Sequence, residues 1–234
     1  MQLSASELAN NLRRVEERIA AAAARVGRDP TDVTLVTVTK TRSLDEVRAV
    51  IEAGAMDLGE NYAQELEAKA EALADVKVRW HAIGHLQTNK VRKLVGLVHL
   101  VHSVDSLRLA KEIDLRAGAA GRELPVLLQV NVSGEESKFG LAPEEVLPLV
   151  REVAGMSAAR LAGLMTMPPY SADPEDSRPH FVALRELRDR LVSAGVPADR
   201  LHHLSMGMTG DFEVAVEEGA TLVRVGTAIF GPRG

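Results

Sequence analysis

The stretch Val33-Thr-Leu-Val-Thr-Val-Thr-Lys40 consists mainly of β-branched residues and ends in a lysine. This composition, shortly after Asp29-Pro30, predicts a buried β-strand. Because side chains alternate between the two faces of a strand, Lys40 is expected on the same face as Val36 and Val38. A lysine at the end of an apolar strand can extend its ammonium group into water. Alternatively, a partly desolvated ammonium group deprotonates more readily and can attack a carbonyl group.

This strand is the first of eight that alternate with amphipathic helices. The strands are predicted over residues 33–40, 55–59, 78–84, 97–104, 124–132, 160–165, 201–205 and 221–226. The helices are predicted over residues 8–26, 44–53, 63–73, 91–95, 105–117, 143–154, 175–193 and 212–218. Ser43 and Glu46 have the spacing of a capping box, which predicts the start of the second of these helices. The pattern predicts an α/β protein, a single (β/α)8 TIM barrel over residues 1–234 with an extra N-terminal helix. A doubly wound open sheet is the competing fold.

The overall composition limits the classes of function. A net charge of −5 at pH 7 argues against broad binding of nucleic acids or membrane surfaces. The absence of cysteine excludes disulfides and thiolate catalysis. No segment resembles a secretion signal or has the roughly 18 apolar residues of a membrane span. We therefore expect a cytoplasmic protein without nucleic-acid or membrane partners, and a barrel that acts as a monomer.

Small residues follow the last two predicted strands. The segments are Leu204-Ser-Met-Gly-Met-Thr-Gly-Asp211 and Leu222-Val-Arg-Val-Gly-Thr227. Backbone N–H groups exposed by such segments, with a helix start behind them, can bind a phosphate without a cationic side chain. In TIM barrels the phosphate site is frequently at this position. The glycines can equally serve only to form tight turns, and the spacing does not decide between the two interpretations.

Arg224 is expected to point into the barrel, because it alternates with Val223 and Val225 on the last strand. A buried guanidinium group requires a partner. One interpretation is an internal ion pair with a carboxylate such as Glu60. The other is a hydrogen bond to an atom of a ligand at the upper centre of the barrel.

The histidine spacings do not favour a metal site. His81 and His85 straddle a strand, where four residues span roughly 13 Å, and His202 and His203 are expected on opposite faces. We therefore expect packing or hydrogen-bonding histidines and no bound metal.

One ligand would use all three features: an aldehyde for Lys40, a phosphate for the glycine segments and a ring atom for Arg224. Pyridoxal 5'-phosphate has these groups. The same residues belong to a set of motifs spread over nearly the whole sequence: Val38-Thr-Lys40, Gly59-Glu-Asn-Tyr62, Trp80-His-Ala-Ile-Gly84, Leu86-Gln-Thr-Asn-Lys90, Ser137-Lys-Phe-Gly140, Gly163-Leu-Met165, Ser205-Met-Gly-Met208 with Asp211, and Val223-Arg-Val-Gly-Thr-Ala-Ile-Phe-Gly231. In these motifs the sequence closely resembles the pyridoxal phosphate homeostasis protein family.

The resemblance implies a barrel similar to the N-terminal domain of alanine racemase, a fold-type III enzyme. It implies a Schiff base between Lys40 and the cofactor, phosphate binding by the segments Ser205–Gly207 and Gly226–Thr227, and Arg224 at the pyridine nitrogen. The full set of expected cofactor-binding residues is Lys40, Asn61, Met165, Ser205, Met206, Gly207, Arg224, Gly226 and Thr227. His85, where many family members have proline, and Gly210 depart from the family pattern.

The expected function is to buffer pyridoxal phosphate and deliver it to enzymes that lack it, without efficient catalysis. A cation beside the pyridine nitrogen disfavours its protonation and weakens the ring as an electron sink. The chain ends at Gly234, so the mouth is expected to be uncovered, and Tyr62 and Tyr170 are the only tyrosines that could act as general acids. The alternatives are a pyridoxal-phosphate-dependent racemase or decarboxylase of amino acids, and a cofactor-free Schiff-base aldolase.

Overall fold

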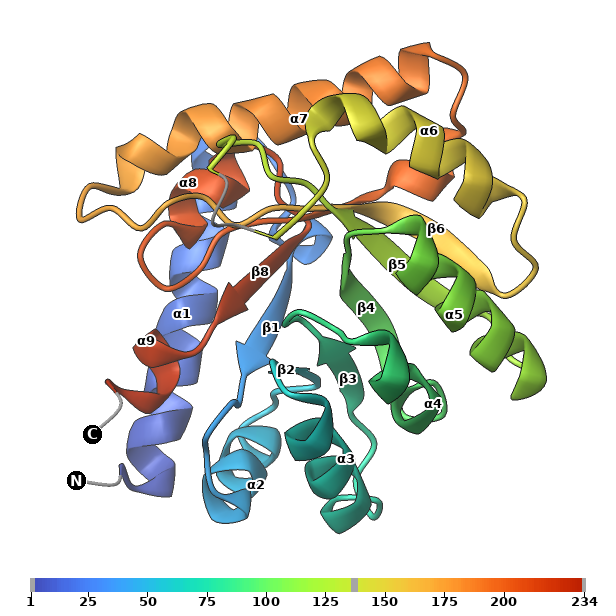
Figure 1. Cartoon of the computed structure of the whole chain (residues 1–234). Helices are drawn as coiled ribbons and strands as arrows, with labels where there is room; N and C mark the ends of the chain where they lie inside the picture. The colour runs from blue at the N-terminus through green and yellow to red at the C-terminus, as the bar shows by residue number, and fades with distance from the viewer. Residues whose placement is uncertain (1–2, 136–138, 233–234) are drawn as a thin grey trace.

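The protein folds into a closed barrel of eight parallel strands, seen in a computed structural model that describes residues 3–135 and 139–232 (Figure 1). The strands pair in chain order, and β8 closes the barrel on β1. They are β1 (Thr34–Val38), β2 (Asp57–Glu60), β3 (Arg79–Ala82), β4 (Val98–Val104), β5 (Leu124–Gln129), β6 (Ala159–Met165), β7 (His203–Ser205) and β8 (Leu222–Val225). The predicted (β/α)8 barrel is confirmed, and the open sheet is wrong.

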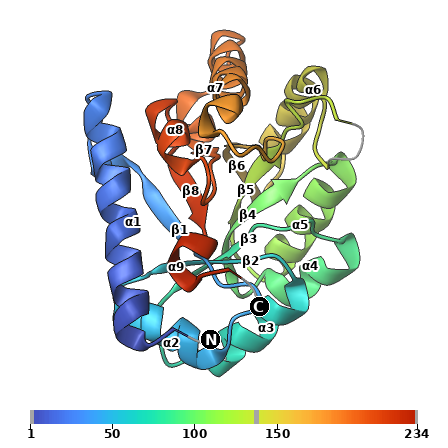
Figure 2. The ribbon, with the colours of Figure 1, turned by 90° about the vertical axis from the view of Figure 1, so that its left-hand side faces the viewer.

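Helices surround the barrel. They are α1 (Ala5–Arg25), α2 (Leu44–Glu52), α3 (Ala63–Ala72), α4 (Val91–Leu94), α5 (Leu107–Ala119), α6 (Pro143–Ala154), α7 (Arg178–Ser193), α8 (Phe212–Glu217) and α9 (Thr227–Phe230). Short 3-10 turns lie at η1 (Pro30–Asp32), η2 (Thr88–Lys90), η3 (Pro174–Ser177) and η4 (Ala198–Leu201). The expected extra helix is α1, which runs along the outside of the barrel and contacts α2, α8 and α9 (Figure 2).

The start of α2 follows from a local sequence signal. The Ser43 hydroxyl accepts a hydrogen bond from the Glu46 backbone N–H at 3.3 Å, and the Glu46 carboxylate accepts one from the Ser43 N–H at 2.9 Å. This reciprocal capping box was expected from the spacing of the two residues, and it satisfies backbone groups that have no partner within the helix.

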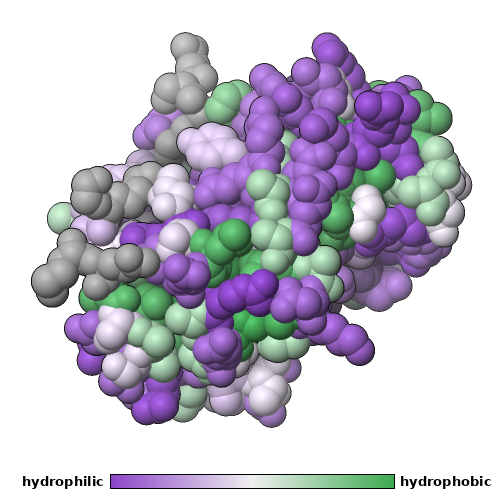
Figure 3. Space-filling view, turned by 90° about the horizontal axis from the view of Figure 1, so that it is seen from below, coloured by the Kyte–Doolittle hydropathy of each residue, from purple (hydrophilic) through white to green (hydrophobic). Residues whose placement is uncertain are grey.

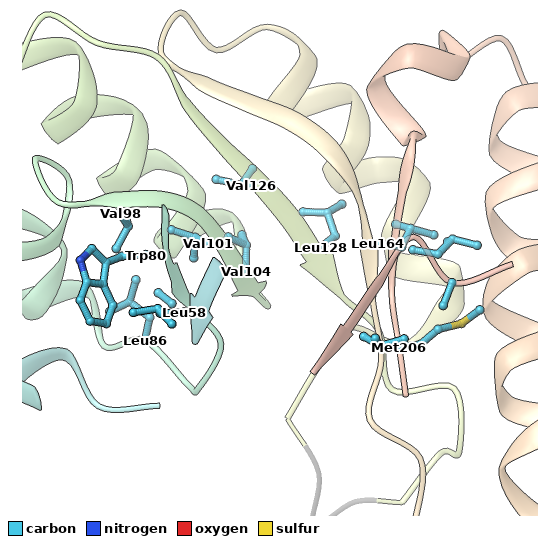
Figure 4. Packing of buried hydrophobic residues seen from close by; sticks show 14 of the residues in the cluster. Leu58, Trp80, Leu86, Val98, Val101, Val104, Val126, Leu128, Leu164 and Met206 are labelled. Atoms are coloured by element: carbon cyan, nitrogen blue, oxygen red, sulfur yellow. The ribbon is translucent and has the colours of Figure 1, made fainter. Parts of the chain in front are cut away.

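Alternation along the strands divides the apolar core into two layers. The layer inside the barrel contains one set of buried side chains: Val36, Val38, Ile83, Leu100, Leu127, Met165 and Leu222. The larger layer lies between strands and helices and includes Trp80, Val101 and Leu164 (Figure 4). Val223 and Val225 belong to this outer layer. Arg224, which lies between them on β8, therefore points into the barrel as predicted.

Several elements differ by a few residues from their predicted bounds, among them β1, β7 and the segment after β8. Strand β1 ends at Val38, because the chain turns at Thr41, whose φ is +63°. Strand β7 begins only at His203, since residues 198–201 form the 3-10 turn η4. Helix α9 was not predicted. It directly follows β8 and places the N–H groups of its first turn at the end of that strand.

Figure 3 views the molecule from below, the side toward which the arrows of β1 and β8 point in Figure 1. Hydrophobic residues are visible near the centre of this view between hydrophilic ones. In the described part of the chain, none of the helices combines the length and apolarity needed to cross a membrane.

Candidate functional site

Lys40 lies two residues beyond the end of β1 and is half-buried. It therefore belongs to the turn at the carboxyl end of the strand and not to the strand itself, which corrects the expected bounds. The backbone N–H of Thr39 still donates to the carbonyl of Gly59 at 3.0 Å, so the chain remains paired with β2 immediately before the lysine. The barrel thus places Lys40 at the end where TIM barrels carry their functional residues.

A buried ion pair fixes the backbone on both sides of Lys40. Lys69 donates to the Thr39 carbonyl at 2.6 Å, to Glu60 at 2.7 Å and to Glu65 at 2.8 Å. The Thr39 hydroxyl donates to Glu60 at 2.6 Å, and the Thr41 N–H donates to Glu65 at 2.6 Å. Burial raises the pKa of Glu60, although the hydrogen bonds from Lys69 and Thr39 oppose this effect. Sequence reasoning missed Lys69; its only signal was its position four residues after Glu65 on a predicted helix.

The turns after β7 and β8 present unpaired backbone donors. Within residues 3–135 and 139–232, no hydrogen bond uses the backbone N–H of Gly207, Gly226 or Thr227. Gly207 is buried, and a buried N–H without a partner is costly. An anion placed at the ends of the two strands would accept hydrogen bonds from these groups. Because α8 and α9 are only 6 and 4 residues long, we assign the binding capacity to the N–H groups and not to helix dipoles.

The two glycines leave no room for a side chain. Gly207 has φ of +90°, and a Cβ there would lie 2.5 Å from the Cβ of Ala215 and 2.9 Å from the Cα of Phe212. A Cβ at Gly226 would lie 3.1 Å from the carbonyl oxygen of Val38, on the neighbouring β1. The same contact brings the turn after β8 beside the segment that leads to Lys40. Lys40 and the unpaired N–H groups therefore lie at the same end of the barrel.

The other two residues of the predicted phosphate segment have partners inside the protein. The Met206 N–H donates to the carbonyl of Leu222 at 3.1 Å, and its side chain is buried in the outer layer (Figure 4). The Ser205 hydroxyl points into the barrel, where it lies 2.8 Å from Nδ1 of His102. Of the segment Ser205–Gly207, Gly207 is therefore the residue with a free backbone donor.

Arg224 is 3% exposed and carries its charge into the barrel. Its guanidinium group donates to the Ser205 hydroxyl at 2.5 Å and to the Thr166 carbonyl at 2.9 Å, at the carboxyl ends of β7 and β6. Burial lowers the pKa of Arg224 to about 10, and the charge of Asp211 partly counteracts this effect. The expected alternative, an ion pair with Glu60, is wrong, because Glu60 pairs with Lys69. In the described chain these bonds use two of the five guanidinium N–H groups, so the others can meet a ligand.

Asn61 and Met165 differ in their surroundings. Met165 ends β6 and is fully buried in the inner layer. Asn61 lines a pocket of about 340 Å³ at the mouth of the barrel, together with Tyr62, Lys90 and Phe139. Phe139 stacks on His85 with 4.1 Å between ring centroids. Ser137 and Lys138, which belong to one of the family motifs, lie outside the described residues.

The histidines make hydrogen bonds, as expected. His81 bonds to His102 at 2.9 Å and to Asp57 at 2.9 Å. His202 and His203 do not point to opposite faces; their ring centroids lie 4.7 Å apart, because His202 precedes β7. Among the residues that the structure describes, no group of three or more His, Asp or Glu side chains is placed to hold a metal ion.

Comparison with known proteins identifies relatives of this chain. The model of the family described as alanine racemase, N-terminal domain, matches residues 6–234. The pyridoxal phosphate homeostasis protein of Aquifex aeolicus is 48% identical over 222 residues, which cover 95% of this chain and 96% of the relative. The homologue in Homo sapiens with the same name is 40% identical and covers 95% of this chain and 85% of the relative.

Solved structures agree with this relationship. PipY of Synechococcus elongatus PCC7942, with PLP bound, superimposes with a TM-score of 0.81 at 35% identity and covers 91% of this chain and 100% of PipY. An alanine racemase from Clostridium difficile 630 superimposes with a TM-score of 0.73 at 16% identity, so it shares the fold alone. Because these matches extend over nearly the full length of the sequence at 40–48% identity, the chain belongs to the pyridoxal phosphate homeostasis protein family.

Proposed function

We propose that this chain binds pyridoxal 5'-phosphate and maintains its supply by buffering and delivering it, without efficient catalysis. The observation that carries the proposal is that three features lie at one end of the barrel: Lys40, the unpaired N–H groups around Gly207 and the buried cation of Arg224. The names of the relatives and the PLP bound to PipY support it.

Each residue has a distinct part in this proposal. The N–H groups of Gly207, Gly226 and Thr227 hold the phosphate, since they have no internal acceptor. Lys40 would hold the aldehyde end of the cofactor, and reversible condensation with an amine, which releases water, is the chemistry that the bound cofactor would supply. Arg224 donates to the pyridine nitrogen. Met165 lies on the inner face of β6 and Asn61 at the mouth, and both are proposed to line the cofactor.

Two features favour holding over turnover. A cation beside the pyridine nitrogen disfavours its protonation, which weakens the electron sink that racemases and decarboxylases require. Tyr62 and Tyr170 are 60% and 95% exposed, and within residues 3–135 and 139–232 neither phenol has a hydrogen-bond partner. A general acid must be held near the proton that it transfers.

An enzyme that lacks its cofactor is the proposed recipient.

The experiment loads purified protein with pyridoxal phosphate and records its absorbance before and after sodium borohydride. Reduction makes the linkage permanent, and mass spectrometry of the peptides then locates it. We expect the label on Lys40 and its loss in Lys40→Ala. Lys90→Ala is the matched control, because Lys90 also lies at the mouth of the barrel. A label on another residue, or full labelling of Lys40→Ala, would contradict the assignment.

A second assay separates carrier from enzyme. The loaded protein is incubated with L-alanine and L-lysine, and racemisation and decarboxylation are compared with those caused by free pyridoxal phosphate. We expect equal rates. Faster turnover by the protein that is lost in Lys40→Ala would establish the enzymatic alternative. Mixing loaded protein with a cofactor-free decarboxylase tests delivery, which predicts recovery of that enzyme's activity.

A further inference from the structure

A continuous chain of hydrogen bonds crosses the interior of the barrel below the proposed site. It starts at Asp57, the first residue of β2, which accepts from His81 at 2.9 Å. His81 bonds to His102 at 2.9 Å, and His102 bonds to the Ser205 hydroxyl at 2.8 Å. The chain ends where the Arg224 guanidinium group donates to the same hydroxyl at 2.5 Å. Strands β2, β3, β4 and β7 each contribute one residue to this series of hydrogen bonds, and β8 contributes Arg224.

The two ends of the chain determine the direction of every bond in it. The Arg224 guanidinium group only donates. Burial alone would raise the pKa of Asp57, but hydrogen bonds from Arg79 and His81 outweigh it and lower this pKa to about 2, so the carboxylate only accepts. With both imidazoles neutral, one arrangement satisfies all links: Ser205 donates to Nδ1 of His102, Nε2 of His102 donates to Nδ1 of His81, and Nε2 of His81 donates to Asp57. Burial lowers the pKa of His102 well below its usual value, which agrees with a neutral ring.

This direction has a consequence for the site. The Ser205 hydroxyl gives its only hydrogen to His102 and accepts from Arg224, so it has no hydrogen left for a phosphate. The guanidinium group is anchored at two points, Ser205 and the Thr166 carbonyl. Without an acceptor at His102, the Ser205 hydroxyl would be free to rotate, and its oxygen would no longer be held in the orientation that accepts from Arg224.

Stability of the barrel alone does not require such a chain. Its surroundings inside the barrel are apolar, and they include Leu100, Leu127 and Met165. Buried polar groups carry a desolvation cost, and well-packed apolar residues often replace them without loss of stability. His102 and Ser205 are fully buried, and every link joins different strands. The group that these hydrogen bonds hold in place is the Arg224 guanidinium group at their upper end.

We propose that Asp57, His81, His102 and Ser205 are positioning residues, which hold Arg224 toward the pyridine ring and keep the Ser205 hydroxyl turned away from the phosphate. This inference rests on the proposed function for the ligand, but the directions of the hydrogen bonds can be tested without any ligand. It adds Asp57, His81 and His102 to the site as residues that act through Ser205 and Arg224.

The first test is ¹⁵N NMR of ligand-free protein with labelled histidine at pH 8. We expect His102 and His81 as neutral rings with the hydrogen on Nε2. His102 with its hydrogen on Nδ1, or His81 as an imidazolium, would reverse the chain and overturn the proposal. This result does not depend on whether pyridoxal phosphate binds to Lys40.

The second test compares two half-substitutions of His102. In His102→Asn the amide occupies the position of Nδ1 and can still accept from Ser205. In His102→Gln it occupies the position of Nε2, so the acceptor for Ser205 is lost. We expect His102→Gln to weaken pyridoxal phosphate binding about tenfold, since a hydrogen bond to a charged group is lost, and to shift the absorbance maximum of the bound cofactor. In His102→Asn both the affinity for pyridoxal phosphate and the absorbance maximum should stay at their wild-type values.

Ser205→Ala serves as a second variant, because it removes a single hydroxyl group and should have the same effect even if His102→Gln does not fold. His203→Gln is the control. His203 also lies on a strand, but it bonds to Thr221 at 3.2 Å and takes no part in the series of hydrogen bonds from Asp57 to Arg224. Wild-type affinity and spectrum in His102→Gln and Ser205→Ala would refute the positioning role. A wild-type protein without a reducible label on Lys40 would instead refute the proposed function, and the two failures are therefore distinct.

Discussion

Gly207→Ala should destabilise the protein and weaken its phosphate site. The new Cβ would lie 2.5 Å from the Cβ of Ala215 and 2.9 Å from the Cα of Phe212, both of which belong to α8. Adopting a left-handed φ costs an alanine about 1–2 kcal/mol. Inserting a methyl group into a closely packed site costs about 1–3 kcal/mol more. We therefore expect a loss of about 2–5 kcal/mol in the free energy of unfolding.

Gly210→Ala is the matched control, because Gly210 belongs to the same loop. A Cβ there meets no atom within 4 Å, its φ is not in the left-handed region, and the residue is exposed. Its effect should stay within about 0.5 kcal/mol, as for most surface substitutions.

The assay is urea unfolding of ligand-free protein, followed by absorbance and fluorescence. Binding of pyridoxal phosphate is then measured at a temperature where both variants are folded. Gly207→Ala should bind more weakly, because relief of the clash moves the Gly207 N–H. Equal unfolding midpoints for Gly207→Ala and Gly210→Ala would show that the loop has room that the structure does not contain, and would refute the reasoning.

Three further predictions concern stability. Lys69→Met should cost about 3–5 kcal/mol, because it leaves the carboxylate of Glu60 buried without its ion-pair partner, and adding Glu60→Gln should recover part of this loss in the same unfolding assay. The pKa of Asp57 falls from 3.8 to about 2 in the folded protein, so its charge contributes about 2 kcal/mol above pH 4, and this contribution disappears as the pH falls toward 2. The stability difference between wild type and Asp57→Asn should shrink over that range, whereas Asp199→Asn, at an exposed position, should show little change; a constant difference for Asp57 would contradict the prediction. Ser43→Ala should cost about 1 kcal/mol through loss of the helix cap, and an unchanged melting temperature would argue against it.

Much of the fold and part of the site follow from local sequence patterns. The alternation of eight apolar strands with amphipathic helices predicted the barrel. The inward direction of Arg224 was predicted from its position between Val223 and Val225, because successive side chains on a strand point to opposite faces. The spacing of Ser43 and Glu46 predicted the start of α2, since both partners of the capping box lie within one helical turn.

The sequence by itself thus determined the eight strands, the helices between them and the inward face of Arg224. Only the tertiary structure decided which groups become partners. Glu60 pairs with Lys69 and not with Arg224, and His102 meets Ser205, which lies 103 residues later in the chain. The physical reason is that closure of the barrel sets the height of each strand against its neighbours. A hydrogen bond requires its two atoms within about 3 Å, and the register of distant strands, which no local pattern encodes, determines which pairs come that close.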